Sequence, residues 1–177
     1  MAGAGGVRVS VIYRDARPAD ASGLDRLFDD VFCGTFGHLY AEEDLEAFLT
    51  GYGIGDWERD LADARFAVRI ADSDEGIAGY VKLGPMKLPI EASGPALLVD
   101  QLYVRTEHHG AGVGAELMDW ASAEARRRGA AELYLTVFVD NHRARRFYER
   151  YGFEPVGKYA FMVGRQADED LILRKRL

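Results

Sequence analysis

The sequence predicts a single α/β domain with a mixed sheet, and three observations favour this fold class. The chain has 177 residues, a length that suits one compact core. Segments with the apolar pattern of strands take turns with segments in which apolar residues repeat at helical spacing. The order is strand, helices, three strands, helix, strand, helix and two strands, without a linker or an internal repeat.

The first part of the chain is expected to supply one strand and several helices. Residues 1–6 predict a loose tail, so the domain is expected to span residues 7–177. The strand that opens this domain places four apolar side chains on one face: Val7, Val9, Val11 and Tyr13. Helical spacing begins after Pro18, which suits a first helical turn. A second helix is expected over residues 42–49 and a short helical segment over residues 57–61.

The second part alternates strands with helices. RFAVRI and IAGYVKLG predict a hairpin, and the apolar segment PALLVDQLYV predicts a central strand. A helix is expected from about Ala115 to Arg128, where Gly129 stops it. After the buried strand ELYLTVFV, Asn141 is the expected N-cap of a helix that Gly152 ends. Two final strands, GFEPVGKYAFMVG and DLILRKRL, complete the sheet.

Composition excludes several classes of protein. The formal net charge of −7 and the pI of about 5.1 argue against nucleic acid as the main partner, which requires a basic face. No apolar stretch approaches the roughly 18 residues of a membrane span, and residues 1–6 are expected to form a loose tail and not a secretory signal, because they lack a basic end and an apolar run. The single cysteine, Cys33, excludes an internal disulfide and a cysteine-based zinc cluster. A cytoplasmic protein without a membrane or nucleic-acid partner is expected.

The stretch HHGAGVG, residues 108–114, joins a predicted central strand to a predicted helix. The first N–H groups of a helix have no partner there, and the helix dipole favours an anion. Glycines at alternate positions remove the Cβ atoms that would keep a phosphate from these amides. The sequence therefore favours a phosphate site over a glycine turn that serves packing alone. The residues expected at this site are His109, Gly110, Ala111, Gly112, Val113, Gly114 and Ala115.

Other interpretations of this loop fit less well. A Walker loop needs a Lys-Ser/Thr pair that is absent. The pattern G-x-G-x-x-A also fits a dinucleotide-binding turn, but about 100 residues precede it and too little chain follows for that fold. His108 and His109 are adjacent and have no nearby partners for zinc, so no metal is expected.

The segments QLYV, H-x-x-G-x-G, AELMDWA, VDN and NHRARRFYERYGF resemble, in order and spacing, the GNAT superfamily of N-acetyltransferases. This resemblance implies a single-domain fold with a mixed, mostly antiparallel sheet of about seven strands, splayed at its centre, and about four helices. It also implies acetyl-CoA as cosubstrate, with its pyrophosphate on the glycine loop. Backbone groups of Leu102, Tyr103 and Val104 would hold the thioester and pantetheine, with Asn141 beside them. His109 departs from the Arg or Gln usual at its position.

The resemblance implies that Tyr148 is the acid that protonates the leaving thiolate, since FYERYGF matches the family's motif. Helical periodicity alone favours a core position, because Tyr148 belongs to an apolar stripe with Ala144, Phe147 and Tyr151. Asp100 is the nearest carboxylate on the central strand and is the candidate base. A plain polar residue on a strand explains Asp100 equally well.

TFGHLYAEEDLEAFL and KYAFMVGRQADEDLILRKRL are similar to PaiA-type polyamine N-acetyltransferases, so the expected acceptor is a primary amine of a small molecule such as a polyamine. The carboxylates of Glu42, Glu43, Asp44 and Glu46 either attract such a cation or simply begin a solvated helix. Two alternatives remain: a CoA-binding module without turnover, and a dinucleotide-dependent dehydrogenase. The sequence leaves a homodimer open.

Overall fold

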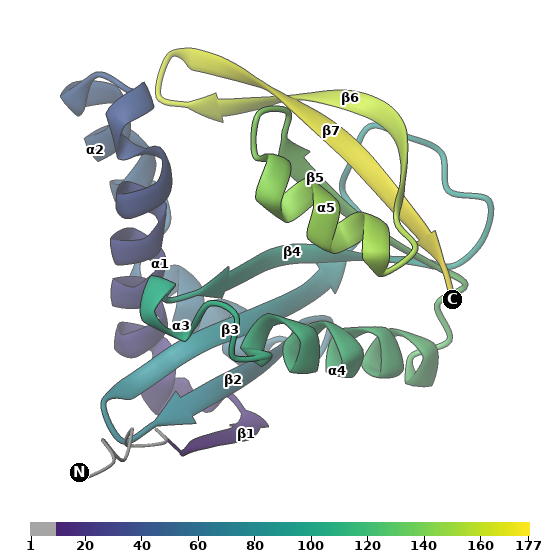
Figure 1. The fold of residues 1–177 in the computed structure, drawn as a ribbon, viewed down its shortest axis with the longest axis horizontal. Helices are drawn as coiled ribbons and strands as arrows, with labels where there is room; N and C mark the ends of the chain where they lie inside the picture. The colour runs from purple at the N-terminus through teal and green to yellow at the C-terminus, as the bar shows by residue number, and fades with distance from the viewer. Residues whose placement is uncertain (1–9) are drawn as a thin grey trace, which may run out of the picture.

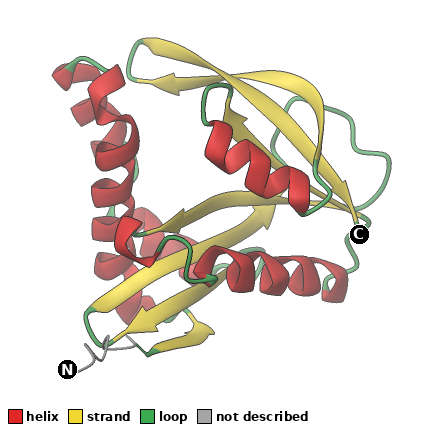
Figure 2. Cartoon of the chain, in the orientation of Figure 1, coloured by secondary structure: helices red, strands yellow, loops and turns green. Residues whose placement is uncertain are grey.

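The computed structural model describes residues 10–177, so the predicted tail and the predicted strand positions Val7 and Val9 lie outside the described residues. Within that range the chain forms seven strands and five α-helices, shown in Figures 1 and 2. The strands are β1 (Val11–Asp15), β2 (Ala67–Ser73), β3 (Gly76–Pro85), β4 (Ala96–Val104), β5 (Glu132–Phe138), β6 (Glu154–Val163) and β7 (Gln166–Arg176). The helices are α1 (Ala21–Phe36), α2 (Glu42–Thr50), α3 (Ile54–Ala62), α4 (Val113–Arg127) and α5 (His142–Arg150).

The described strands form one sheet in the order β1-β2-β3-β4-β5-β7-β6. Among their pairings, β4 with β5 is parallel and the others are antiparallel. The parallel pair has register only over three positions, Ala96–Leu98 against Glu132–Tyr134. Beyond Leu98 the two strands separate, which Figure 1 shows as a wedge between β4 and β5. The mixed, mostly antiparallel and centrally splayed sheet expected from the sequence is confirmed.

The two faces of the sheet carry separate apolar cores. On one face α4 and α5 pack against the central strands, with the predicted stripe Leu117, Met118, Ala121 and Ala125 fully buried. On the other face α1 and α3 enclose Trp57 and Tyr80, and α2 adds an aromatic cluster against β6. Because residues alternate along a strand, β4 faces both cores: Leu102 and Val104 pack with the first, and Tyr103 with the others.

The helices differ from the sequence prediction mainly at their ends. α4 begins at Val113, two residues before the predicted Ala115, because Gly112 takes a left-handed conformation (φ 85°) and is the N-cap. The short segment expected around Trp57 is a full nine-residue helix, α3, whose Trp57 is buried. Across the described part of the chain, we find no helix that is both long enough and apolar enough to span a membrane.

Candidate active site

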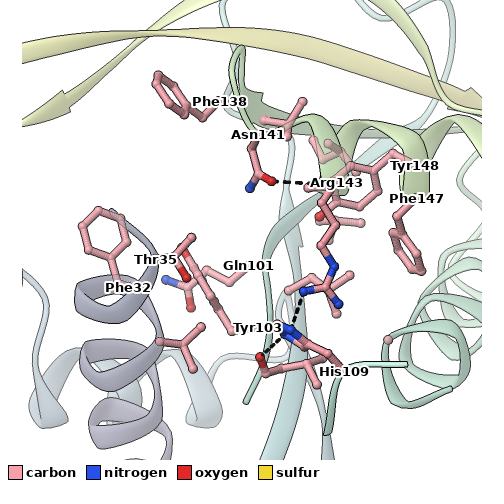
Figure 3. Close-up of a pocket in the computed structure, with 18 of the residues that line it drawn as sticks. Phe32, Thr35, Gln101, Tyr103, His109, Phe138, Asn141, Arg143, Phe147 and Tyr148 are labelled. Atoms are coloured by element: carbon pink, nitrogen blue, oxygen red, sulfur yellow. Dashed lines mark hydrogen bonds between the residues drawn. The ribbon is translucent and has the colours of Figure 1, made fainter. Parts of the chain in front are cut away.

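A cleft of about 740 Å³ opens where β4 and β5 separate. Its wall includes every residue that the sequence predicts for the site except Ala111 (Figure 3 labels several). Further lining comes from α1, from the turn after it and from β7, three elements to which the sequence assigned no firm role. The splay therefore creates one continuous space that reaches from the glycine loop to the β6–β7 hairpin.

The exposed edge of β4 offers backbone groups to this cleft. The Arg105 N–H donates to the Ala78 carbonyl of β3 at 2.8 Å. Backbone groups alternate in direction along a strand, so Tyr103 also faces β3, whereas Leu102 and Val104 face the gap toward β5. The structure thus gives different roles to Leu102, Tyr103 and Val104, which the sequence predicted to act alike. Leu102 and Val104 present their amides to the cleft, while Tyr103 contributes its ring.

The loop between β4 and α4 is shaped by two glycines. Gly110 and Gly112 have φ angles of 79° and 85°, a region that side-chain-bearing residues rarely adopt. A Cβ atom added to either would meet no protein atom within 4 Å, so open space lies beside both. Gly114 has no such backbone requirement, but it lies in the first helical turn beside Phe147.

The first turn of α4 has amides available for an anion. The Glu116 N–H donates to the Gly112 carbonyl at 3.0 Å as the first bond of the helix. The amides before it, of Val113, Gly114 and Ala115, therefore have no helical partner, and no side chain caps this end. The amides of His109 and Ala111 already donate to carbonyls of the preceding turn. The stretch whose amides are available to an anion is thus shorter than the predicted stretch from His109 to Ala115.

The His109 side chain links the end of β4 to α5. Its Nε2 lies 2.9 Å from the Val104 carbonyl oxygen, and its Nδ1 contacts the guanidinium of Arg143 on α5. A carbonyl only accepts and a guanidinium only donates, so this geometry selects the neutral tautomer with the proton on Nε2. Figure 3 shows Arg143 extending from α5 toward His109. The sequence prediction missed Arg143, because the contact joins residues 34 positions apart.

Two predicted residues come from the segment after β5. The side chain of Asn141 accepts a hydrogen bond from the Ala144 N–H at 3.2 Å, which confirms its N-cap role, and it also lines the cleft. Tyr148 is buried with its ring against Phe147 and Phe153. The ring of Tyr148 therefore belongs to the core, as helical periodicity predicts, and it also lines the cleft, while its role as the acid stays a prediction.

The Tyr148 hydroxyl is well suited to keep its proton. Burial raises the pKa of this phenol well above its ordinary value of 10. Within residues 10–177 no hydrogen bond joins the hydroxyl to another side chain or to the backbone, although the ring is packed on both sides. A protonated phenol without an internal partner is available to a group bound in the cleft.

Asp100 lies on the cleft wall but is engaged elsewhere. It occupies the irregular position of β4, where the register with β3 shifts. One carboxylate oxygen lies 2.6 Å from the Lys87 ammonium and the other 3.4 Å from that of Lys82. Lys82 is itself buried and donates to Asp60 at 2.5 Å and to the Tyr52 hydroxyl at 2.8 Å. With both oxygens paired to lysines, Asp100 belongs to an ion-pair network at the β4 irregularity.

Carboxylates on β7 form an acidic end to the cleft. Asp168 and Asp170 lie on the same face of β7, and both line the cleft. The Tyr40 hydroxyl, from the turn after α1, donates to Asp168. Asp170 is buried, and burial together with neighbouring Asp168 raises its pKa to about 6. The aromatic rings of Phe32 and Phe36 complete this end.

The acidic residues at the start of α2 have a different role from the one considered in the sequence. Asp44 accepts hydrogen bonds from the backbone and side-chain N–H groups of Arg165, both at 2.9 Å. Glu43 lies 3.6 Å from the same guanidinium. None of the four carboxylates at this helix start lines the cleft. Asp44 and Glu43 link the β6–β7 turn to α2, and the acidic surface that faces the cleft comes from β7.

Comparison with known proteins identifies a family and several proteins that this chain resembles in sequence or in fold. The acetyltransferase (GNAT) family model matches residues 25–153. An uncharacterized N-acetyltransferase of Lactobacillus delbrueckii subsp. lactis is 26% identical over 158 residues, which cover 84% of this chain and 87% of that protein. Streptothricin acetyltransferase of Streptomyces lavendulae is 31% identical over 157 residues and 80% of each chain. The structure of PaiA N-acetyltransferase from Thermoplasma acidophilum with coenzyme A shares the fold, with a TM-score of 0.75 at 20% identity over 95% of this chain and 99% of that one.

Proposed function

The chain belongs to the acetyltransferase (GNAT) family and is an acetyl-CoA-dependent N-acetyltransferase, and from this premise we propose that its acceptor is a small cationic molecule with a primary amine, such as a polyamine. Family membership removes the two alternatives left open by the sequence, the dehydrogenase and the CoA-binding module without turnover. One observation supports the acceptor class: the cleft carries opposite charges at its two ends.

We assign the basic end of the cleft to the pyrophosphate of acetyl-CoA. The unpartnered amides of Val113, Gly114 and Ala115 point an anion-binding helix terminus at this end. The Arg143 guanidinium, held by His109, adds a fixed positive charge beside them. Arg143 thereby replaces the cationic or amide side chain that the loop lacks at position 109. The open space beside Gly110 and Gly112 leaves room for phosphate oxygens.

The middle of the cleft suits the reacting thioester. The free β4 edge offers the amides of Leu102 and Val104, which can hold the thioester carbonyl oxygen and the pantetheine arm. The Tyr148 hydroxyl then supplies the proton that the leaving thiolate needs. Burial holds this proton on the phenol until a thiolate forms, and the same burial raises the proton affinity of the thiolate.

The acidic end suits a cationic acceptor. Asp168 and Asp170 face the cleft together with the aromatic rings of Phe32 and Phe36. Carboxylates attract an ammonium group, and aromatic faces favour both its charge and the methylene chain next to it. The resemblance of both ends of the chain to PaiA-type polyamine N-acetyltransferases favours the same class of acceptor.

The test is steady-state release of free thiol from acetyl-CoA with four classes of acceptor: polyamines, amino acids, aminoglycosides and peptide N-termini. We expect the highest kcat/KM with spermidine or spermine. KM for these acceptors should rise with added salt, because salt screens charges over about 8 Å at physiological ionic strength. A clear preference for an anionic or uncharged acceptor would reject the acceptor assignment and leave the acetyltransferase activity intact.

A further inference from the structure

Asp170 is a buried carboxyl that the fold does not neutralise. Only 6% of the residue is exposed, and it lies on β7 between Phe138 of β5 and Tyr159 of β6. Among residues 10–177, no lysine, arginine or histidine forms an ion pair with it. Burying a carboxylate without a cation is costly, so a position kept only for packing would favour an apolar residue. The acidic side chain therefore indicates a role in the cleft that it lines.

We infer that Asp170 is the general base that takes the proton from the reacting ammonium of the acceptor, while Asp168, held by Tyr40, binds a second cationic group of the acceptor. The inference rests on the proposed amine acceptor and deepens it. Asp100 is the other carboxylate on the cleft wall, but both of its oxygens already hold lysines. Asp170 has no such partner, and Asp168 keeps its place through the Tyr40 hydroxyl.

Asp170 and the proposed acid Tyr148 both lie near the Tyr103 ring and line the same cleft. The pKa of Tyr103 is raised by burial first and then by the charges of its neighbours, which include Tyr148 and Asp170. The Tyr103 ring thus has the proposed acid and the proposed base as electrostatic neighbours. All three side chains line the cleft.

The proton balance of the reaction is complete with these two residues. The Asp170 carboxylate takes one proton from the acceptor ammonium and leaves a neutral amine. The amine nitrogen forms a bond to the thioester carbonyl carbon, and the carbon–sulfur bond breaks. Tyr148 gives its hydroxyl proton to the departing sulfur, and its phenolate regains a proton from the nitrogen of the new amide. Asp170 then releases its proton to solvent, so the reaction yields the amide, free CoA and one proton.

The surroundings of Asp170 set the pH range in which it can act. It faces Asp168 on its own strand, Thr136 of β5, Tyr159 of β6, Tyr40 after α1 and Tyr103 of β4. Burial and the Asp168 charge raise the pKa of Asp170 to about 6, while the Thr136 hydroxyl opposes this rise. A base is most effective when its pKa lies just below the working pH, so Asp170 is ionised and ready at neutral pH.

The experiment compares the pH profile of kcat in wild type, Asp170→Asn and the control Glu169→Gln, from pH 5 to 9. Glu169 is the neighbouring carboxylate on β7, exposed and paired with Lys158 at 3.1 Å. Wild type and control should lose activity below a midpoint near pH 6. Asp170→Asn should lower kcat by about 10²-fold or more and should lack this acid limb. The loss should shrink with weakly basic amines such as hydroxylamine, which are already unprotonated at neutral pH.

Two further variants should shift the acid limb of the kcat profile while they keep Asp170. Thr136→Val deletes the hydroxyl that favours the ionised carboxyl, so the acid limb should move to higher pH. Asp168→Asn removes a neighbouring negative charge, so the limb should move to lower pH. A purely structural role for Asp170 would produce neither shift.

The series is run on whichever acceptor wild type uses best. A preferred anionic acceptor would therefore reject the proposed acceptor class without deciding the role of Asp170. An Asp170→Asn variant that kept kcat and its acid limb, and changed only KM, would overturn the assignment of Asp170 as base. Unshifted acid limbs in both neighbouring variants would overturn it as well.

Discussion

A comparison of Gly112→Ala with Gly129→Ala distinguishes the loss of anion binding at the loop from the loss of stability that backbone strain causes. Gly112 has a φ of 85°, and Gly129 at the other end of α4 has a φ of 82°. A Cβ atom at either position would meet no protein atom within 4 Å. Alanine in this left-handed region costs about 1–2 kcal/mol, so Gly112→Ala and Gly129→Ala should lose similar amounts of unfolding free energy. Gly129→Ala is thus a matched control for strain.

The two variants should differ in their affinity for acetyl-CoA. At Gly112 the added methyl group enters the space assigned to the phosphates, so Kd should rise by about 10-fold or more, equivalent to about 1.4 kcal/mol. At Gly129 the methyl group lies at the far end of the helix, and Kd should stay near the wild-type value. Calorimetric titration gives Kd and thermal unfolding gives stability. Equal Kd values for two folded variants would refute the assignment of the phosphates to this loop.

The remaining predictions concern three side chains of the cleft. Tyr148→Phe keeps the ring packing, so Tm should change little while kcat falls by about 10- to 10³-fold. A chemical step that kept its wild-type rate in single-turnover kinetics would contradict the assignment of Tyr148 as the acid. Arg143→Ala should raise Kd for acetyl-CoA by about 10-fold, because a charged hydrogen bond is worth about 1.5–3 kcal/mol, and His109→Ala should have a smaller effect in the same titration. Asp170→Asn should stabilise the fold at pH 8 by up to about 3 kcal/mol, because a pKa raised to about 6 means that ionising the buried carboxyl costs folding free energy. That gain should be full above pH 6 and absent below about pH 4, and thermal unfolding that shows no pH dependence of the difference would argue against the raised pKa.

The parts of the site that follow from the sequence are those with local signals. Gly112 and the helix after it form one strand–loop–helix unit, and Asn141 caps the helix that follows it in the chain. Such contacts connect near neighbours, so spacing alone can predict them. The start of α4 was misplaced by two residues because the conformation of Gly112, which spacing does not specify, decides where the helix begins.

The parts that the sequence did not reveal depend on distant segments. Asp168 and Asp170 enter the cleft only because β7 pairs with β5 and lies beside the end of α1. Their alternation with Glu169 was a signal, since two acidic residues on one strand face lead directly into the buried Ile172. For Asp100 the sequence left a base and a plain polar strand residue equally open, and only the fold brings the buried Lys82 to it.

One measurement tests the acceptor assignment most directly: the ratio of kcat/KM for a diamine to that for an ω-amino acid of equal length. The two acceptors share the reacting amine and the methylene chain and differ only in the charge at the far end. The acidic end formed by Asp168 and Asp170 predicts a ratio above about 10 in wild type, equivalent to about 1.4 kcal/mol. The ratio should fall toward one in Asp168→Asn. A wild-type ratio near or below one, unaffected by that substitution, would contradict the account.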